Sequence, residues 1–128
     1  MTPVPSHVPG VHLLLDLWGA AHLDDAVAIE EALLAAVAAS GAELVTYHIE
    51  QFPAGGVTAF AVLSTSHLSL HSWPEYGYCA VDVFTCGPHD PAAVVPVFQR
   101  AFETEQVQVT EIARGRQPAG GIHVASTP

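Results

Sequence analysis

The stretch that decides the fold is Ser64–Gly87, which reads STSHLSLHSWPEYGYCAVDVFTCG. It contains two runs of alternating residue character, residues 67–73 and 78–86, joined by Pro-Glu-Tyr-Gly. Alternation with a period of two is typical of β-strands, and a Pro- and Gly-containing segment between two such runs is typical of a turn. The stretch therefore predicts a β-hairpin. It also holds most of the chain's reactive side chains, so we expect any chemistry to start here.

The turn determines the register of this hairpin. With Trp73 paired to Tyr78, antiparallel pairing places Ser66 opposite Thr85. Cys86 is the next residue along the chain. A hydroxyl and a thiol that are far apart in sequence are therefore expected to be neighbours.

Alternation also assigns the side chains of the hairpin to its two faces. In residues 67–73 one face is expected to be polar and aromatic, with His67, Ser69, His71 and Trp73, and in residues 78–86 the same alternation groups Tyr78, Ala80, Asp82, Phe84 and Cys86. A one-residue change in the turn would change which face Cys86 shares. Cys79 lies an odd number of positions from Cys86 in the same strand, so the two cysteines should point to opposite faces and form no disulfide within it. This arrangement fits a reducing compartment.

Further strands are expected at residues 11–18, 43–52, 57–63 and 107–112, because each of these segments is rich in residues that favour strands. In the first of them, Val11, Leu13, Leu15 and Leu17 should face the core, and His12, Leu14, Asp16 and Trp18 should face the other way.

Two helices are expected between these strands. The first should be capped by Asp24 and Asp25 and should end at Gly41. Its apolar positions are Val27, Leu33, Leu34 and Val37. The second should begin at Pro91 behind the capping residue Asp90. Its buried stripe is expected to be Val94, Val95, Phe98 and Phe102.

This order of elements predicts an α+β fold. Two helices that cover one face of a largely antiparallel sheet make a two-layer α/β sandwich. The 128 residues are enough for a single domain, with residues 1–9 and 117–128 as loose tails.

Composition narrows the classes of function. A formal net charge of −10 argues against a nucleic-acid partner and is compatible with a small cationic substrate. No apolar run approaches the roughly 20 residues of a membrane span, so we expect a cytoplasmic protein without membrane contact. The chain contains no lysine, which excludes a pyridoxal phosphate cofactor held as a lysine Schiff base.

Two segments of the hairpin resemble a known family signature. The segments 66–78 (SHLSLHSWPEYGY) and 80–87 (AVDVFTCG) are similar to the signature of prokaryotic S-adenosylmethionine decarboxylases. Weaker similarity extends to residues 12–14, to Phe52 with residues 56–58, and to residues 114–116.

The resemblance implies a pyruvoyl-dependent decarboxylase of polyamine biosynthesis that makes its own cofactor. In this family a serine attacks the preceding carbonyl, the chain is cut, and the serine becomes the pyruvoyl group. That serine would be Ser66, so cleavage would fall after Thr65 and yield fragments 1–65 and 66–128. The pyruvoyl carbonyl replaces pyridoxal phosphate, and no metal is implied.

Other roles are implied by position in the same family. His71, with the hydroxyl of Thr58, would assist self-processing, and Cys86 would return a proton to the product. Substrate-binding roles would fall to three residues, Phe52, Trp73 and Glu75. The family's site forms between two subunits, so a homodimer of processed chains is implied.

The chain departs from the family pattern at Thr65, where these enzymes usually have glutamate. The implied reaction converts S-adenosylmethionine to its decarboxylated form and CO2. Relatives act on L-ornithine or L-arginine, and the missing carboxylate leaves these substrates as an alternative. A second alternative is an unprocessed pseudoenzyme that acts as a binding or regulatory subunit.

A metal site is the third alternative. His67 and His71 would share one strand face, and Glu75 or His89 could complete a set of ligands. We weigh this below the pyruvoyl interpretation, which already uses these side chains.

Overall fold

The computed structural model describes residues 10–86, 88–118, 120–122 and 124. Its elements are β1 (Val11–Trp18), α1 (Ala26–Ser40), β2 (Leu44–Gln51), β3 (Val57–Leu63), β4 (His67–Trp73), β5 (Tyr78–Thr85), α2 (Val94–Ala101) and β6 (Gln106–Ala113). The predicted tail 1–9 lies outside the described residues, and the predicted tail 117–128 lies partly outside them.

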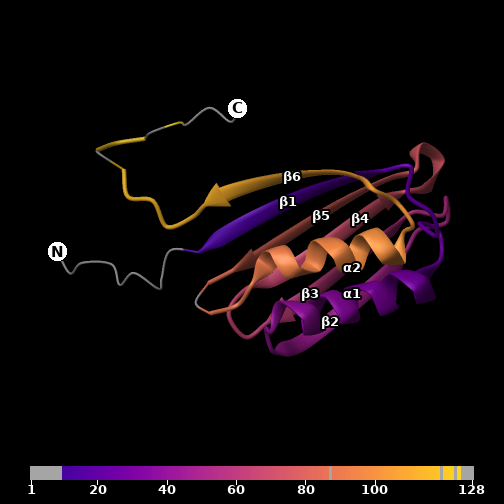
Figure 1. The fold of residues 1–128 in the computed structure, drawn as a ribbon, viewed down its shortest axis with the longest axis horizontal. Helices are drawn as coiled ribbons and strands as arrows, with labels where there is room; N and C mark the ends of the chain where they lie inside the picture. Colours follow the sequence, from indigo (N-terminus) through magenta and orange to yellow (C-terminus); the bar gives the residue numbers. More distant parts are fainter. Residues whose placement is uncertain (1–9, 87, 119, 123, 125–128) are drawn as a thin grey trace.

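All the strands belong to one antiparallel sheet. Its six strands have the order β2-β3-β4-β5-β1-β6, so β2 and β6 form the two edges. Both helices lie on the same side of this sheet, where they pack against each other (Figure 1). The opposite side has no helix among the described residues. The predicted α+β sandwich is confirmed.

The central hairpin has the predicted register. Trp73 pairs with Tyr78, and the ladder runs back to the pair of His67 and Phe84. The turn is a single 3₁₀ turn at Pro74–Tyr76, followed by Gly77 with φ 62°. A positive φ is strained for residues with a Cβ atom, which explains why glycine closes this turn.

The helix-facing side of the sheet forms the core. Leu13, Leu15 and Leu17 of β1 are buried there, as predicted. From the central hairpin, Leu68, Leu70, Cys79, Val81 and Val83 join them. These residues occupy alternate positions, as the pleat of a β-strand requires.

The first helix differs from the prediction in its cap and its buried face. Asp25 alone caps it, because its carboxylate accepts hydrogen bonds from the backbone of Val27 and Ala28. Asp24 instead offers its carbonyl to Gln51. Of the apolar positions at helical spacing, Leu33 and Val37 are buried, whereas Val27 is exposed and Leu34 only partly buried. The buried face is Ile29, Ala32, Leu33, Ala36 and Val37.

The second helix begins later than predicted. Pro91–Ala93 form a 3₁₀ turn, which Asp90 caps through the backbone of Ala92. The α-helix proper starts at Val94. The predicted stripe is confirmed at Val94, Phe98 and Phe102, which are fully buried, whereas Val95 is partly buried.

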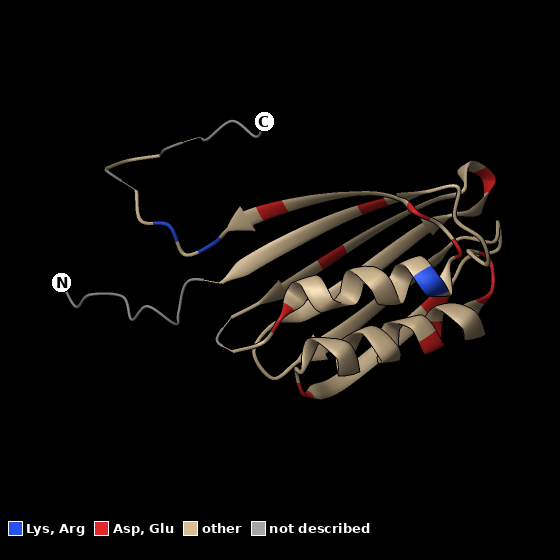
Figure 2. Ribbon diagram, in the orientation of Figure 1, with Lys and Arg blue, Asp and Glu red and all other residues tan. Residues whose placement is uncertain are grey.

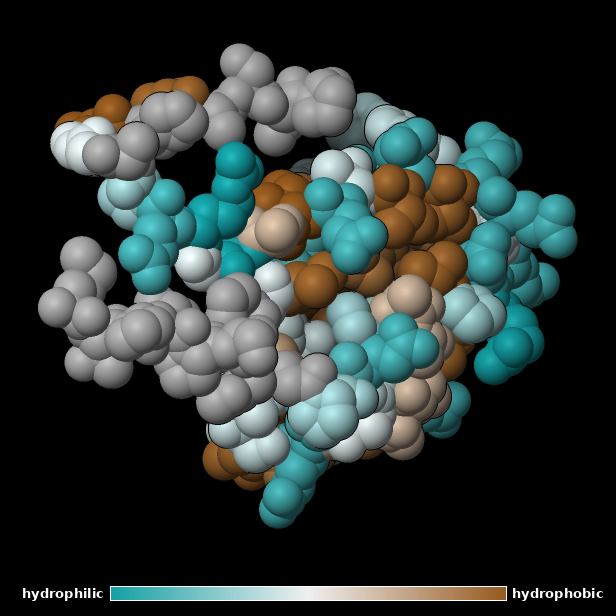
Figure 3. All heavy atoms as spheres, turned by 60° about the vertical axis from the view of Figure 1, so that its left-hand side comes forward, coloured by the Kyte–Doolittle hydropathy of each residue, from teal (hydrophilic) through white to brown (hydrophobic). Residues whose placement is uncertain are grey.

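Charge is distributed unevenly over the molecule. Acidic residues occur in both layers, whereas basic residues occur in α2 and after β6 (Figure 2). The chain's only three basic residues besides histidine are Arg100, Arg114 and Arg116. Hydrophobic side chains also reach the surface, where Figure 3 shows them in brown beside hydrophilic residues in teal. No helix in the described part of the chain is long and apolar enough to span a membrane.

Candidate active site

The predicted site residues fall into two groups at the two ends of the β4–β5 hairpin. One group surrounds a pocket at the end nearest the turn. The other group is the β3–β4 turn and the residue that follows β5. In the first group, Thr58, His71 and Trp73 occupy the strand positions that alternate with the buried residues of the core.

The first group lines one open pocket of about 210 Å³. Five predicted site residues contribute to it: Phe52, Thr58, His71, Trp73 and Glu75. Thr58 and His71 are cross-strand partners in β3 and β4, and Thr58 Oγ1 lies 3.0 Å from His71 Nδ1. The structure therefore joins a hydroxyl and an imidazole in a hydrogen bond at the wall of a pocket that also contains an aromatic ring and a carboxylate.

The second group centres on the turn between β3 and β4. The backbone N–H of Leu63 donates to the carbonyl of Ser66 at 2.9 Å, and the N–H of Ser66 donates back to the carbonyl of Leu63 at 3.3 Å. Thr65 is exposed in this turn. The Oγ atom of Ser66 is buried and has no hydrogen-bond partner among the described residues. Buried hydroxyls are normally paired, so an unpaired one points to a functional role.

Cys86 belongs to the same end of the sheet. The last hairpin pair joins His67 to Phe84, so the register continues to Ser66 opposite Thr85, next to Cys86. Cys86 is a free, partly exposed thiol, whereas Cys79 is free and buried. The predicted proximity of Ser66 and Cys86 is thus consistent with the observed register.

The two groups do not meet within one chain. Ser66 and His71 are five positions apart along an extended strand, which corresponds to about 17 Å at 3.3 Å per residue. Trp73 is farther still. One chain therefore carries the serine and the thiol at one end of the hairpin and the pocket at the other end.

An aromatic stack lies beside the pocket. Trp18, Tyr78 and Trp73 stack in series, with ring centroids 4.5 Å and 5.3 Å apart. The Tyr78 hydroxyl donates to Asp16, and burial together with this bond raises the pKa of Tyr78 to about 12. Asp16 also lines a neighbouring hollow of about 340 Å³ on the uncovered side of the sheet. The stack therefore presents neutral rings beside a carboxylate.

Asp82 is the centre of a hydrogen-bonded cluster nearer to Ser66. Its Oδ2 atom lies 2.7 Å from His12 Nε2 and 2.8 Å from His67 Nε2, and its Oδ1 accepts from the hydroxyl of Ser69. Burial would raise the pKa of Asp82, but the hydrogen bonds from Ser69, His12 and His67 outweigh it and hold the pKa below its ordinary value. The cluster thus has an anionic centre.

Comparison with known proteins places this geometry in a family. The family model described as S-adenosylmethionine decarboxylase matches residues 11–115, which include both groups of site residues. The chain belongs to the S-adenosylmethionine decarboxylase family. The resemblance in the central hairpin is confirmed.

Relatives support the same assignment. The S-adenosylmethionine decarboxylase proenzyme of Thermomicrobium roseum is 45% identical over 108 residues, which cover 83% of this chain and 93% of that protein. The proenzyme of Methanococcus maripaludis strain C7 is 47% identical over 109 residues, which cover 83% of this chain and 89% of that protein. The crystal structure of the Aquifex aeolicus adenosylmethionine decarboxylase matches with a TM-score of 0.74 at 30% identity, over 90% of this chain and 98% of that one.

The Asp82 cluster was not predicted as part of the site of this family member. Part of the cluster could have been predicted from the hairpin, because the predicted register pairs Ser69 with Asp82 and places His67 on the same face. His12 and Arg114 could not be added from the sequence, since they lie in other parts of the chain. Arg114 Nη1 lies 3.1 Å from His12 Nδ1, and its guanidinium carbon lies 5.2 Å from the centre of the Phe84 ring.

The ligand set of the metal alternative is not assembled. His67 contacts Asp82, whereas His71 contacts Thr58. Among the described residues, His12, His67 and Asp82 are the one set whose ligand atoms lie within 4.8 Å of one another.

The tautomer of His12 disfavours a metal in that set. Arginine only donates hydrogen bonds, so His12 Nδ1 must accept from Arg114 and its proton lies on Nε2, facing Asp82. A metal on Nε2 would move that proton to Nδ1, against the guanidinium. The residues therefore fit a hydrogen-bonded cluster better than a metal centre.

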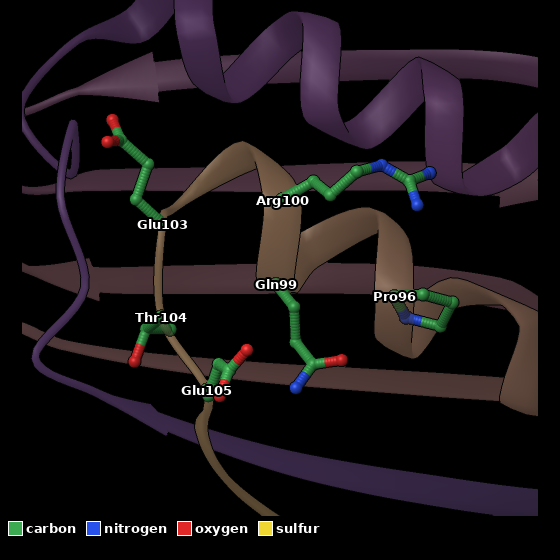
Figure 4. Close-up of a pocket in the computed structure, with 6 residues that line it drawn as sticks. All are labelled: Pro96, Gln99, Arg100, Glu103, Thr104 and Glu105. Carbon is green, nitrogen blue, oxygen red and sulfur yellow. The ribbon is translucent and has the colours of Figure 1, made fainter.

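A separate pocket of about 410 Å³ lies away from both groups. It is formed by the end of α2 and the connection to β6, with Pro96, Gln99, Arg100, Glu103, Thr104 and Glu105 around it (Figure 4). None of the predicted site residues borders it. We therefore assign it no part in the chemistry.

The lowered pKa of Asp82 predicts a specific acid sensitivity. A carboxylate with a depressed folded-state pKa stabilises the fold above its ordinary pKa of 3.8, and this contribution is lost as the pH falls through the folded value. At pH 6 we expect Asp82→Asn to lower the free energy of unfolding by about 2 kcal/mol, typical for lost hydrogen bonds to a charged group. The deficit should shrink as the pH falls below 3.8.

Urea unfolding at a series of pH values measures this effect. The Ser66→Ala background keeps the chain in one piece. Parallel pH curves with and without the Asp82→Asn substitution would contradict the assignment of an ionised, hydrogen-bonded Asp82.

Proposed function

We propose that this chain is a self-processing, pyruvoyl-dependent decarboxylase that converts S-adenosylmethionine to its decarboxylated form and CO2 in polyamine biosynthesis. Membership of the decarboxylase family supports the reaction. The observation that carries the self-processing is the buried, unpaired Ser66 Oγ in a turn closed by two backbone hydrogen bonds with Leu63. An unpaired hydroxyl is available to attack the neighbouring carbonyl, because it has no competing hydrogen bond to break.

Self-cleavage proceeds through an ester. Ser66 Oγ attacks the carbonyl carbon of Thr65, and the Thr65–Ser66 C–N bond breaks as the ester forms. Elimination frees the carboxylate of Thr65 and leaves a dehydroalanine. Hydrolysis then consumes one water, releases one ammonia and leaves the pyruvoyl group at the start of fragment 66–128.

The residues at the β3–β4 turn fit this group. When formed, the pyruvoyl group supplies a carbonyl that accepts electrons as carbon dioxide leaves, a task for which the lysine-free chain has no pyridoxal phosphate anchor. The thiol of Cys86 donates a proton to the product carbon, a role supported by its position next to the partner residue of Ser66. The hydrogen-bonded Thr58 and His71 move protons during processing.

The pocket binds the substrate. Trp73 and Phe52 offer ring faces to the sulfonium cation, since aromatic faces attract cations. Glu75 accepts hydrogen bonds from the ribose hydroxyls, as carboxylates do. The net charge of −10 further favours a cationic substrate. Thr65 removes one carboxylate from the usual family pattern, and Glu75 remains.

The active unit is a homodimer. Its support is the distance between the two groups: a serine and a thiol that lie about 17 Å or more along the strand from the pocket require a second chain to complete the site. The uncovered side of the sheet provides the surface, because Trp18, Phe60 and Trp73 remain 49%, 42% and 40% exposed. Exposed aromatic groups of this kind are typical of protein interfaces.

Intact-protein mass spectrometry tests the proposal. Purified wild-type protein should consist of two fragments split before Ser66, with residue 66 converted to pyruvoyl, whereas Ser66→Ala should stay a single chain. Release of CO2 should occur with S-adenosylmethionine and should be much slower with ornithine and arginine.

Each outcome has a distinct meaning. A wild-type chain that stays uncut like Ser66→Ala would overturn the enzyme and leave a pseudoenzyme. A cut chain that prefers ornithine or arginine would keep the reaction type and overturn the substrate.

A further inference from the structure

The Asp82 cluster joins the strand that carries Ser66 to two other strands of the sheet. His67 and Ser69, both in β4, bind Asp82 in β5, and His12 reaches the same carboxylate from β1. His67 is the residue directly after Ser66. The cluster therefore holds two of the first three residues of β4 through side chains as well as through the backbone ladder.

Self-cleavage, which belongs to the proposed function, would remove the covalent connection between β3 and β4. In the uncut chain, the turn and its two Leu63–Ser66 hydrogen bonds tie the start of β4 to β3. Cutting the Thr65–Ser66 bond turns residue 66 into a chain end. Chain ends fray unless something ties them down. The reacting carbonyl would sit on this end, one residue before His67.

The geometry of the cluster is suited to holding the start of β4 in place. Asp82 accepts three side-chain hydrogen bonds while it is only 24% exposed. Arg114 fixes the tautomer of His12, so that its Nε2–H points at Asp82. The ring of His67 also stacks on Phe60 of β3, with centroids 5.5 Å apart and planes 12° from parallel. Hydrogen bonds to an ionised carboxylate are stronger than neutral ones.

We propose that the Asp82 cluster is a clamp that keeps the new N-terminal end of β4 in register after cleavage and so holds residue 66 beside Cys86. Asp82 is then a positioning residue. Its contribution to the position of residue 66 is small while the turn is intact and large once the turn is cut.

The absence of lysine from the chain allows a test that does not depend on self-cleavage. Thr65→Lys combined with Ser66→Ala creates one cleavage site for a lysine-specific protease, in an exposed turn. The protein is compared before and after this single cut, with and without Asp82→Asn. Hydrogen exchange of the backbone amides in peptides covering β4 is measured by mass spectrometry.

The clamp predicts that the effect of the cut on β4 depends on Asp82. With Asp82 present, cutting should change β4 exchange by less than about twofold, whereas with Asp82→Asn it should accelerate exchange about tenfold or more through local fraying. Ser69→Ala, which removes one hydrogen bond from the cluster, should give a smaller effect of the same kind and serves if Asp82→Asn does not fold. Glu30→Gln is the control. It removes a carboxylate that accepts from the hydroxyl of Tyr47 in the edge strand β2 at 2.9 Å, away from the cluster, and should behave like the parent.

Two results would overturn the clamp. One is fast β4 exchange in the cut parent, equal to that of the cut Asp82→Asn protein. The other is an acceleration by Asp82→Asn that is the same before and after the cut, which is what a purely structural role would give. Failure of the proposed function has a separate signature, an uncut wild-type chain in the mass spectrum.

Discussion

Cys86→Ala is expected to cleave like the wild type and to lose about 10²- to 10⁴-fold in kcat, the range for a lost acid–base group. The partly exposed thiol follows Thr85, the expected partner of Ser66, so we expect it to lie where it can protonate the product carbon. Alanine leaves no proton donor at that position. Steady-state CO2 release from S-adenosylmethionine, with the cut confirmed by mass, measures the loss.

The other cysteine is a matched control. Cys79 is fully buried under the helices, and burial raises its pKa to about 12, so it stays a protonated thiol without access to substrate. We expect Cys79→Ala to cost about 1 kcal/mol of stability through lost packing and to leave kcat within about twofold. A Cys86→Ala enzyme with near wild-type kcat would remove Cys86 from the mechanism.

Mixing two inactive variants is expected to restore activity if the site is shared between chains. Cys86→Ala damages the end with the serine, and Glu75→Gln damages the pocket. In a mixed dimer, one site combines both damaged parts and the other combines both intact parts. Random reassortment of equal amounts makes half of the dimers mixed, so activity should rise to about a quarter of the wild-type value.

This measurement requires the chains to exchange, which co-expression ensures. Each variant expressed alone is the control, and both should have little activity. No recovery in the co-expressed sample, with mixed dimers verified by mass, would show that the site lies within one chain. It would thereby contradict the dimer argument from the strand length.

The hairpin shows how much of the fold is local. Residues 67–73 and 78–85 alternate, and the 3₁₀ turn closed by Gly77 pairs Trp73 with Tyr78. Because side chains alternate between the two faces of a strand, the register set by the turn assigns every side chain of the hairpin to one face. The errors came where local signals were ambiguous: two adjacent aspartates could cap α1, and the choice of Asp25 placed Val27 in the exposed first turn.

The candidate site was predicted in part for the same reason. The family signature lies in the hairpin, so Ser66, His71, Trp73, Glu75 and Cys86 could be found by position. The sequence also predicted that Ser66 and Cys86 would be near each other. It did not indicate that Phe52 and Thr58 line one pocket with Trp73 and Glu75, because that depends on how β3 and the segment before it lie beside β4.

The sequence by itself determined the family, the α+β class, the register of the central hairpin and the face of each of its side chains, because turn geometry and alternation are local properties. Only the tertiary structure decided that β1 lies between β5 and β6, which brings His12 to Asp82 across 70 residues and Arg114 to His12 across 102. Hydrogen bonds of this range depend on which strands become neighbours. That choice is made by burying the apolar face of the whole sheet under two helices, which no single segment encodes.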